Sequence, residues 1–416
     1  MLSLEINIRK KMISVLSPHL TFADLITFFS LGKNPSLKFE KKLCEKFAVK
    51  YALTYSSGRA GLYHILKANN IKNKNVLITA YTCCVVTEAI IQSGNKIIFV
   101  DTNKGSFNST MLENHINKYR ADLAAVIITN LYGISSYEKL KYLADRKNFL
   151  VIIDNALSPG DILNAPKELY DYIFISSGVR KPFTTLGGGV VFANDWDKYK
   201  TLLDYTVSNR KNIKPSDKLK QFLFLFLFFL AFRKLIYPFT SFVRRRTDLL
   251  QPFFNEKNND IYSTPPEYFF DMSSFQKRIG INQLEKIYDL LDRRKKISNL
   301  YYTLLSPHFN FVREYWKLDT PYSHVPFLHP QRDELQAYLL NKKIDTEKYF
   351  DYAVPNLEPY QGNEACLNVS AGFPNADHIS NQIINLPVNV ELNEKTIIKI
   401  VNEIIQFGKN PSVKFN

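Results

Sequence analysis

Residues 176–192 read SSGVRKPFTTLGGGVVF, and this stretch decides the fold. Arg180 and Lys181 stand directly before Pro182, and three glycines, 187–189, lead into a β-branched run. Such a stretch has three interpretations: a basic surface turn, a glycine loop that cradles a phosphate, or the site of a lysine that does covalent chemistry. The sequence on either side distinguishes them.

The first half of the chain alternates apolar runs with helical patterns. NVLITAY (75–81), KIIFVD (96–101), AAVIITNLYG (124–133) and FLVIIDNA (149–156) are rich in Val and Ile, as strands covered on both faces are. RAGLYHILKANNI, from residue 59, has the spacing of a helix that buries one face. Repeated strand–helix units predict an α/β domain with a largely parallel sheet.

The second half has a different pattern. Residues 273–305 predict one long helix, and 332–343 a shorter one. A terminal helix is expected over 393–407, with Asn393 as its N-cap. We therefore expect a large domain over residues 1–250, with an N-terminal arm, and a smaller α+β domain over 251–416.

Composition narrows the class of protein. The chain has 416 residues, 45% of them hydrophobic, and a net charge of +15. Four cysteines form neither a disulfide framework nor a metal-ligand pattern, so we expect no metal site and a reducing, cytoplasmic location. The N-terminus lacks the pattern of a signal peptide. The positive charge suits polyanions, but no nucleic-acid-binding motif accompanies it, and we expect no nucleic acid partner.

Residues 222–232 read FLFLFLFFLAF, an unusual run for a soluble surface. It is shorter than the ~20 apolar residues that a spanning helix needs. Two interpretations stay open: a buried helix or dimer-contact hairpin, and a segment lying in the membrane interface with Lys and Arg at the headgroups. The second predicts a peripheral contact with the inner face of the cell membrane through residues 221–246.

Polar residues follow several of the predicted strands. Gly58 stands between a strand and a helix, where free amides make an anion site. Asp154 ends an apolar strand, at the edge where α/β sheets bind ligands. Ser176 ends the next strand, and Lys181 follows five residues later. Taken singly, each also fits ordinary turn or cap chemistry.

In this order and spacing, the set resembles the pyridoxal-phosphate-dependent sugar aminotransferases of the DegT/DnrJ/EryC1/StrS family. The resemblance extends over nearly the whole chain, from FEKKLCEKFAVKYALTYSSGRAGLYHIL (39–66) to FPNADHISNQIINLPVNVELNEKTIIKIVNEI (373–404). It implies the aspartate-aminotransferase fold (fold type I), with a mostly parallel, seven-stranded sheet in the large domain. It also implies pyridoxal 5′-phosphate (PLP) as cofactor, and a homodimer with sites at the subunit interface.

The resemblance assigns roles to single residues. Lys181 matches the Schiff-base lysine that moves a proton during transamination, and Asp154 matches the carboxylate that pairs with the pyridinium nitrogen. Ser176 and the backbone amides of Gly58 and Arg59 match the phosphate cradle. Arg59 stands where the family usually has Thr, and its guanidinium is available for a phosphate or diphosphate. The dehydratase branch carries His in place of the lysine, so Lys181 favours transamination.

Some positions depart from the family pattern. The usual Gln three residues after the Asp is Leu157, and the aromatic residue that stacks on the ring is Cys83, a role that Tyr81 is expected to take. The Asn and Arg that reach the partner subunit's site are Phe269 and Asp271. The usual Gly-Glu-Gly-Gly is Leu-Gly-Gly-Gly from residue 186.

We therefore expect a PLP-dependent aminotransferase that acts on a nucleotide-linked keto sugar, with a glutamate-like donor, in surface polysaccharide or glycolipid biosynthesis. The departures leave two alternatives open. One is a catalytically reduced or regulatory family member. The other is a PLP enzyme for a different lipid-linked or non-sugar ketone.

Overall fold

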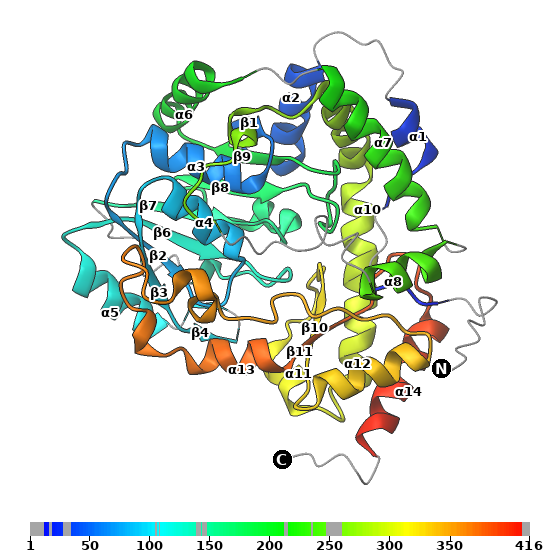
Figure 1. The fold of residues 1–416 in the computed structure, drawn as a ribbon. Helices are drawn as coiled ribbons and strands as arrows, with labels where there is room; N and C mark the ends of the chain where they lie inside the picture. Colours follow the sequence, from blue (N-terminus) through cyan, green and yellow to red (C-terminus); the bar gives the residue numbers. More distant parts are fainter. Residues whose placement is uncertain are drawn as a thin grey trace.

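The computed structural model describes residues 12–15, 19–27, 35–104, 106–107, 109–138, 143, 148–211, 215–233, 236–246 and 260–409. Within them, a central sheet lies between helices, and further helices with a small sheet follow toward the C-terminus (Figure 1). The helices are α1 (Phe22–Ile26), α2 (Pro35–Phe47), α3 (Gly58–Ala68), α4 (Cys84–Gln92), α5 (Ser109–Tyr119), α6 (Trp196–Asn209), α7 (Pro215–Ala231), α8 (Tyr237–Arg246), α10 (Ser274–Leu305), α11 (Asn310–Tyr315), α12 (Arg332–Asn341), α13 (Pro374–Gln382) and α14 (Glu394–Gly408).

The central sheet has seven strands in the order β1-β9-β8-β7-β6-β2-β3. Of these, β9 runs antiparallel to both its neighbours, and all the other pairings are parallel. The strands are β1 (Tyr51–Tyr55), β2 (Asn75–Thr79), β3 (Lys96–Val100), β6 (Leu123–Thr129), β7 (Leu150–Asp154), β8 (Tyr172–Ser176) and β9 (Gly189–Ala193). The prediction of an α/β fold with a mostly parallel sheet is confirmed.

The apolar strand runs are explained by burial on both faces. Alternate side chains of one strand enter different cores: Ile152 of β7 packs in the cluster that includes α3 and α4, whereas Val151 and Ile153 pack with α2. Because consecutive strand residues point to opposite faces, both faces of β7 must be apolar. Helices on the two faces therefore hold the sheet's carboxyl edge in place, and the candidate site lies at that edge.

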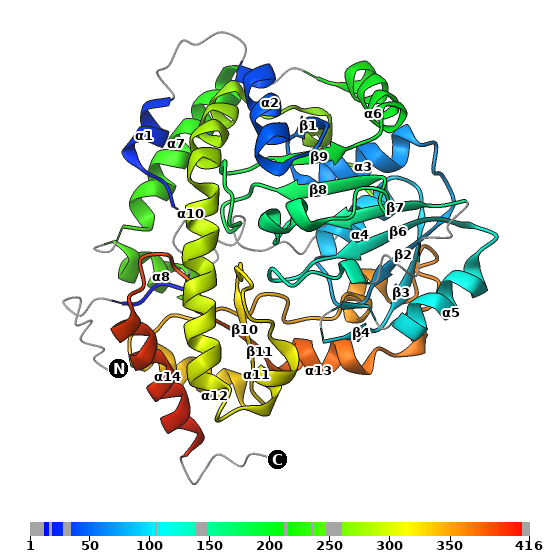
Figure 2. The same cartoon turned by 180° about the vertical axis from the view of Figure 1, so that it is seen from behind.

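The C-terminal part is organised by α10, which contacts α2 at one end of the molecule and α14 toward the other (Figure 2). Ser273 and Gln276 close a capping box at its start. A two-stranded antiparallel sheet of β10 (Val325–Leu328) and β11 (Ile383–Leu386) packs against α12 and α13. As predicted, Asn393 caps α14, its side chain accepting from the Thr396 amide.

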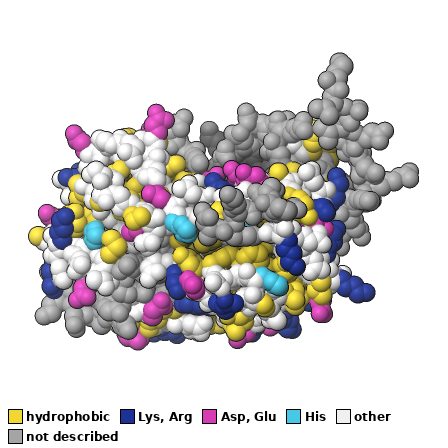
Figure 3. Space-filling view, turned by 90° about the horizontal axis from the view of Figure 1, so that it is seen from below, with side chains coloured by type: hydrophobic (Ala, Val, Ile, Leu, Met, Phe, Trp, Pro, Cys, Tyr) yellow, Lys and Arg dark blue, Asp and Glu magenta, His cyan; other side chains and the backbone are white. Residues whose placement is uncertain are grey.

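The expected domain boundary at 250/251 falls in residues 247–259, outside the described residues, so the division into two domains stays a prediction. Within the described part of the chain, no helix has both the length and the apolar character needed to cross a membrane. The face seen from below carries side chains of both charge signs, with hydrophobic ones gathered in a band across its middle (Figure 3).

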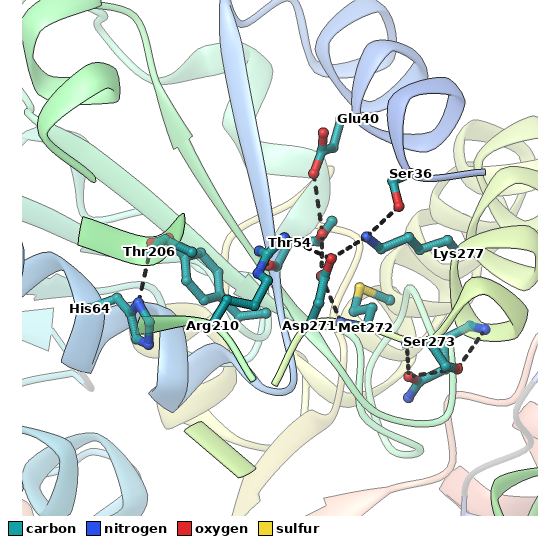
Figure 4. A network of polar contacts seen from close by, with 12 residues as sticks. Ser36, Glu40, Thr54, His64, Thr206, Arg210, Asp271, Met272, Ser273 and Lys277 are labelled. Carbon is teal, nitrogen blue, oxygen red and sulfur yellow. Dashed lines mark hydrogen bonds and ion pairs between the residues drawn. The ribbon is translucent and has the colours of Figure 1, made fainter. Parts of the chain in front are cut away.

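A network of ion pairs joins the start of α10 to β1 and the end of α6 (Figure 4). Asp271 Oδ2 lies 2.6 Å from Nζ of Lys277, whose side chain is 1% exposed, and 2.9 Å from Nη1 of Arg210. The Thr54 hydroxyl donates to Asp271 Oδ1 at 2.7 Å. Burial raises the pKa of Glu40, which lies beside this network. Asp271 is therefore the carboxylate that compensates the buried charge of Lys277.

We predict that Asp271→Leu destabilises the protein by about 3–5 kcal/mol, because it leaves the Lys277 ammonium buried without its carboxylate. Urea unfolding of the cofactor-free protein measures this. Asp271→Leu combined with Lys277→Met removes both charges, and we expect it to recover most of the loss. Equal losses in the single and the double variant would contradict this account of the network.

Candidate active site

The predicted anion site is formed by two backbone segments in close contact. Gly58 is the first residue of α3, and Ser57 caps the helix by accepting from the Ala60 amide. A Cβ atom on Gly58 would lie 3.3 Å from Ser176 Cβ and 3.2 Å from the Ile175 carbonyl oxygen. The start of α3 therefore touches the carboxyl end of β8, and its free amides and the Ser176 hydroxyl are brought to one place, as an anion requires.

Gly187, Gly188 and Gly189 set the path of the backbone into β9. Gly187 and Gly188 have φ of 141° and 116°, which other residues rarely adopt. A Cβ atom on Gly189 would lie 2.3 Å from the Gly58 nitrogen, so β9 begins directly against the start of α3. Gly189 is thus required for the close approach of two backbones.

Asp154 is the last residue of β7, beside β8, and its side chain is buried. It pairs in register with Phe174, two residues before Ser176. Asp154 Oδ1 accepts from the Ala156 amide at 2.9 Å. Because β7 and β8 are parallel, the carboxylate and the Ser176 hydroxyl lie at the same edge of the sheet.

Lys181 lies in a loop that folds back over this edge. The amides of Thr185 and Gly187 donate to the Ser177 carbonyl, and the Ser177 amide donates to the Gly188 carbonyl. These three hydrogen bonds join the two ends of the loop. A Cβ atom on Gly178 would lie 3.6 Å from Ser176 Oγ and 3.9 Å from Lys181 Cγ, so both side chains border Gly178. The loop thus keeps Lys181 beside the predicted cradle.

The Lys181 ammonium has a partner that the sequence does not indicate. Its Nζ donates to the hydroxyl of Tyr349 at 2.8 Å. The Tyr349 ring stacks on His324, with centroids 4.3 Å apart and planes 2° from parallel. The Arg180 guanidinium lies 4.5 Å from the same ring and pairs with Glu347 at 3.0 Å. Tyr349 is held on both sides, with its hydroxyl at the lysine.

His324 is fully buried beside these cations. Burial, and then the charges of Arg180 and Lys181, lower its pKa well below the usual range of histidine. Its ring is therefore neutral at neutral pH, and an uncharged ring stacks on Tyr349 without adding a third cation to the cluster.

Tyr81 is connected to the lysine through two other tyrosines. Its hydroxyl lies 2.7 Å from that of Tyr132, which donates to the Tyr349 carbonyl at 2.8 Å. Tyr81 is fully buried, and Cys83, two residues on, precedes α4 without a side-chain cap. The structure thus links Tyr81, through Tyr132, to Tyr349, the residue that contacts Lys181. The stacking of Tyr81 on a cofactor ring stays a prediction.

The Arg59 side chain contacts two glutamates and a tyrosine outside the predicted phosphate cradle. Its guanidinium lies 3.7 Å from Glu88 and 3.9 Å from Glu267, and it also approaches the ring of Tyr268 at 5.8 Å. The Arg59 backbone amide stays in the first turn of α3, at the cradle. A contact between the Arg59 guanidinium and a phosphate stays a prediction. A phosphate there would compete with the carboxylates of Glu88 and Glu267 for the guanidinium.

The departures from the family pattern have structural consequences. Leu157 is buried and supplies no polar group where the family has Gln, while the neighbouring Ser158 hydroxyl donates to the Asn130 carbonyl. Asp271 points into the ion-pair network of its own chain, and the Phe269 ring packs against Tyr63 and His64. These two side chains serve the interior of their own subunit.

The residues present fit PLP. When bound, this cofactor supplies an electron sink for the carbon that exchanges its amino group. The α3 amides and Ser176 would supply donors for its phosphate, Asp154 a buried carboxylate for its ring nitrogen, and Lys181 an amine for its aldehyde. Among the described residues, no group of three or more His, Cys, Asp or Glu side chains is placed to hold a metal ion.

We predict that Gly58→Ala weakens PLP binding about ten- to hundredfold, because the methyl group crowds the cradle at a cost of about 1–3 kcal/mol. Absorbance titration of the cofactor-free protein measures the affinity. Gly61→Ala is the control: its Cβ would meet Val191 Cγ2 at 2.7 Å in the core, so stability should fall while cofactor affinity stays near that of the wild type. Unchanged affinity in Gly58→Ala would disprove the cradle.

We also predict that Tyr349→Phe lowers kcat about tenfold or more with little change in KM, because a hydrogen bond to a charged group contributes about 1.5–3 kcal/mol. The rate at which added PLP develops its absorbance band should fall as well. Tyr360→Phe is the matched control, since its hydroxyl contacts Thr87 instead, 2.8 Å away. If both variants behave alike, Tyr349 has only a packing role.

Comparisons with known proteins identify the family of the chain. Residues 26–222 and 248–405 match the DegT/DnrJ/EryC1/StrS aminotransferase family, which leaves 223–247 unmatched. The UDP-4-amino-4,6-dideoxy-N-acetyl-beta-L-altrosamine transaminase of Campylobacter jejuni is 24% identical over 372 residues, 86% of this chain and 85% of that protein. The dTDP-4-amino-4,6-dideoxy-D-glucose transaminase of Escherichia coli is 24% identical over 382 residues, 88% of each chain.

A solved structure shares the fold. PseC of Helicobacter pylori, an aminotransferase involved in the biosynthesis of pseudoaminic acid, superposes with a TM-score of 0.72 at 18% identity, over 95% of this chain and 99% of that one. The sheet order, the lysine loop and the family match over most of the chain lead to one conclusion. This chain belongs to the DegT/DnrJ/EryC1/StrS family of PLP-dependent aminotransferases.

Proposed function

We propose that this enzyme transfers an amino group from a glutamate-like amino acid to a nucleotide-linked keto sugar, in the biosynthesis of a surface polysaccharide or glycolipid. The observation that carries the proposal is the arrangement at one edge of the sheet: Asp154 and Ser176 end neighbouring parallel strands, the start of α3 lies against Ser176, and Lys181 stands in the loop that follows Ser176. Relatives named for UDP- and dTDP-linked amino sugars support the class of substrate.

Each residue has a proposed task. The amides of Gly58 and Arg59 and the Ser176 hydroxyl bind the cofactor phosphate. Asp154 holds a proton on the cofactor ring nitrogen, and Lys181 moves a proton at the substrate carbon. Tyr349 receives the lysine amine in a hydrogen bond and so keeps it at a fixed position.

We predict that borohydride reduction of the PLP-loaded enzyme, followed by peptide mass spectrometry, finds a pyridoxyl group on Lys181. Lys181→Ala should carry no such group and lose at least about a hundredfold in kcat against a panel of nucleotide-linked keto sugars. Lys200→Ala, at an exposed lysine of α6, is the control and should resemble the wild type. An unlabelled Lys181 would refute the proposal.

Two alternatives have an observation in their favour. Leu157 and Phe269 are apolar where the family has polar contacts, which suits a catalytically reduced or regulatory member, or a PLP enzyme for a lipid-linked or non-sugar ketone. A pyridoxyl group on Lys181 without turnover of any nucleotide sugar would favour the second alternative. An unlabelled lysine in a folded protein would favour the first.

We further propose the assembly and location that the family resemblance and the apolar segment suggest. The enzyme is a homodimer of chains, each with a large domain over residues 1–250 and a small one over 251–416. It works in the cytoplasm, at the inner face of the cell membrane, with residues 221–246 as its peripheral contact and without a nucleic acid partner.

A further inference from the structure

The apolar segment forms the second half of α7 and the whole of α8, and both lie outside the family match. Residues 223–247 have no counterpart in the matched family regions, and they contain most of α7 and all of α8. In both ribbon views α1, α7 and α8 lie on one side of the molecule, and α10 separates them from the sheet (Figures 1 and 2). Within this layer, the second half of α7 and the whole of α8 fall in the unmatched residues 223–247.

One face of the layer is firmly attached to the enzyme. Phe228 and Phe229 of α7 are buried in a cluster with Leu20, Phe275 and Ile279. Val179 and Leu186 of the lysine loop pack against the same cluster. In α8, the hydroxyls of Tyr237 and Ser241 both donate to Asp345. The interpretation of a buried helix is thus correct for one face of α7.

The opposite face of α7 carries large apolar side chains that are exposed to solvent. Leu219, Leu223 and Leu227 follow each other at intervals of four residues along α7, and they are 56%, 51% and 64% exposed. Phe226 of α7, Phe239 and Phe242 of α8, and Phe22 and Ile26 of α1 are exposed as well. We call these eight residues the outer face. A cluster of this kind marks an interaction site.

The charge of the segment decides what binds there. Residues 218–246 contain seven Lys or Arg and no Asp or Glu. Of these, Lys220 and Arg233 are exposed, and the Arg233 guanidinium lies 3.6 Å from the Phe229 ring and 5.6 Å from the Phe22 ring. A second copy docked face to face would bring these cations against each other, whereas anionic lipid headgroups would neutralise them.

We propose that the outer face of α1, α7 and α8 docks the enzyme on an anionic lipid bilayer. Leu and Phe side chains of the outer face enter the headgroup–acyl boundary, and the exposed Lys220 and Arg233 meet lipid phosphates. The inference deepens the proposed membrane location and rests on it, but it does not depend on the transamination chemistry.

The test is flotation of the full-length enzyme with vesicles of phosphatidylcholine, alone or mixed with phosphatidylglycerol. We expect the wild type to float with the mixed vesicles and to be released by high salt. The triple variant Leu223→Ser, Leu227→Ser and Phe239→Ser should bind at least tenfold more weakly. The matched control changes three exposed leucines elsewhere, at positions 163, 318 and 367, to Ser and should float like the wild type.

Three outcomes would overturn the docking face: a wild type that does not float, a triple variant that floats equally well, or a triple variant that changes from dimer to monomer in light scattering. Because its three positions are exposed, we expect the triple variant to fold. Thermal unfolding measures whether it does. Borohydride labelling of Lys181 in the same variant should match the wild type. A failure of docking is thereby distinguished from a failure of the proposed chemistry.

Discussion

The close approach of two backbones is the constraint on which the site depends. The start of α3 lies against the end of β8 and the beginning of β9, with no room for a side chain at Gly189 and little at Gly58. This contact brings the free amides of a helix to a strand-end hydroxyl. It also fixes where the 177–188 loop leaves and re-enters the sheet, and that loop carries Lys181. The fold and the chemistry therefore share one packing requirement.

The change at residue 271 alters how the subunit is held together. At this position, where the family resemblance predicts an arginine, the chain has a carboxylate that pairs with the buried Lys277 and contacts Arg210 and Thr54. Such an ion pair is costly to break singly, because the remaining charge stays buried. Phe269 packs inward in the same way. Both side chains are therefore committed to contacts within their own chain.

The sheet and the strand-end residues were predictable, because local patterns encode them. Apolar runs covered on two faces identify the strands, and the order of Gly58, Asp154, Ser176 and Lys181 indicates the site. Tyr349 was not predictable: it follows Lys181 by 168 residues and meets it only through tertiary packing. The exposed face of α7 was not predictable for another reason. Residues 222–232 are apolar without interruption, so no periodicity distinguishes the buried side from the open one.

Helix α7 is connected to the lysine loop by packing. Phe228 and Phe229 face inward to the cluster that Val179 and Leu186 also join, and Val179 is two residues from Lys181. Because packed interiors transmit small displacements, a movement of α7 has a route by packing to the lysine loop. The inner face of α7 is therefore part of the surroundings of Lys181.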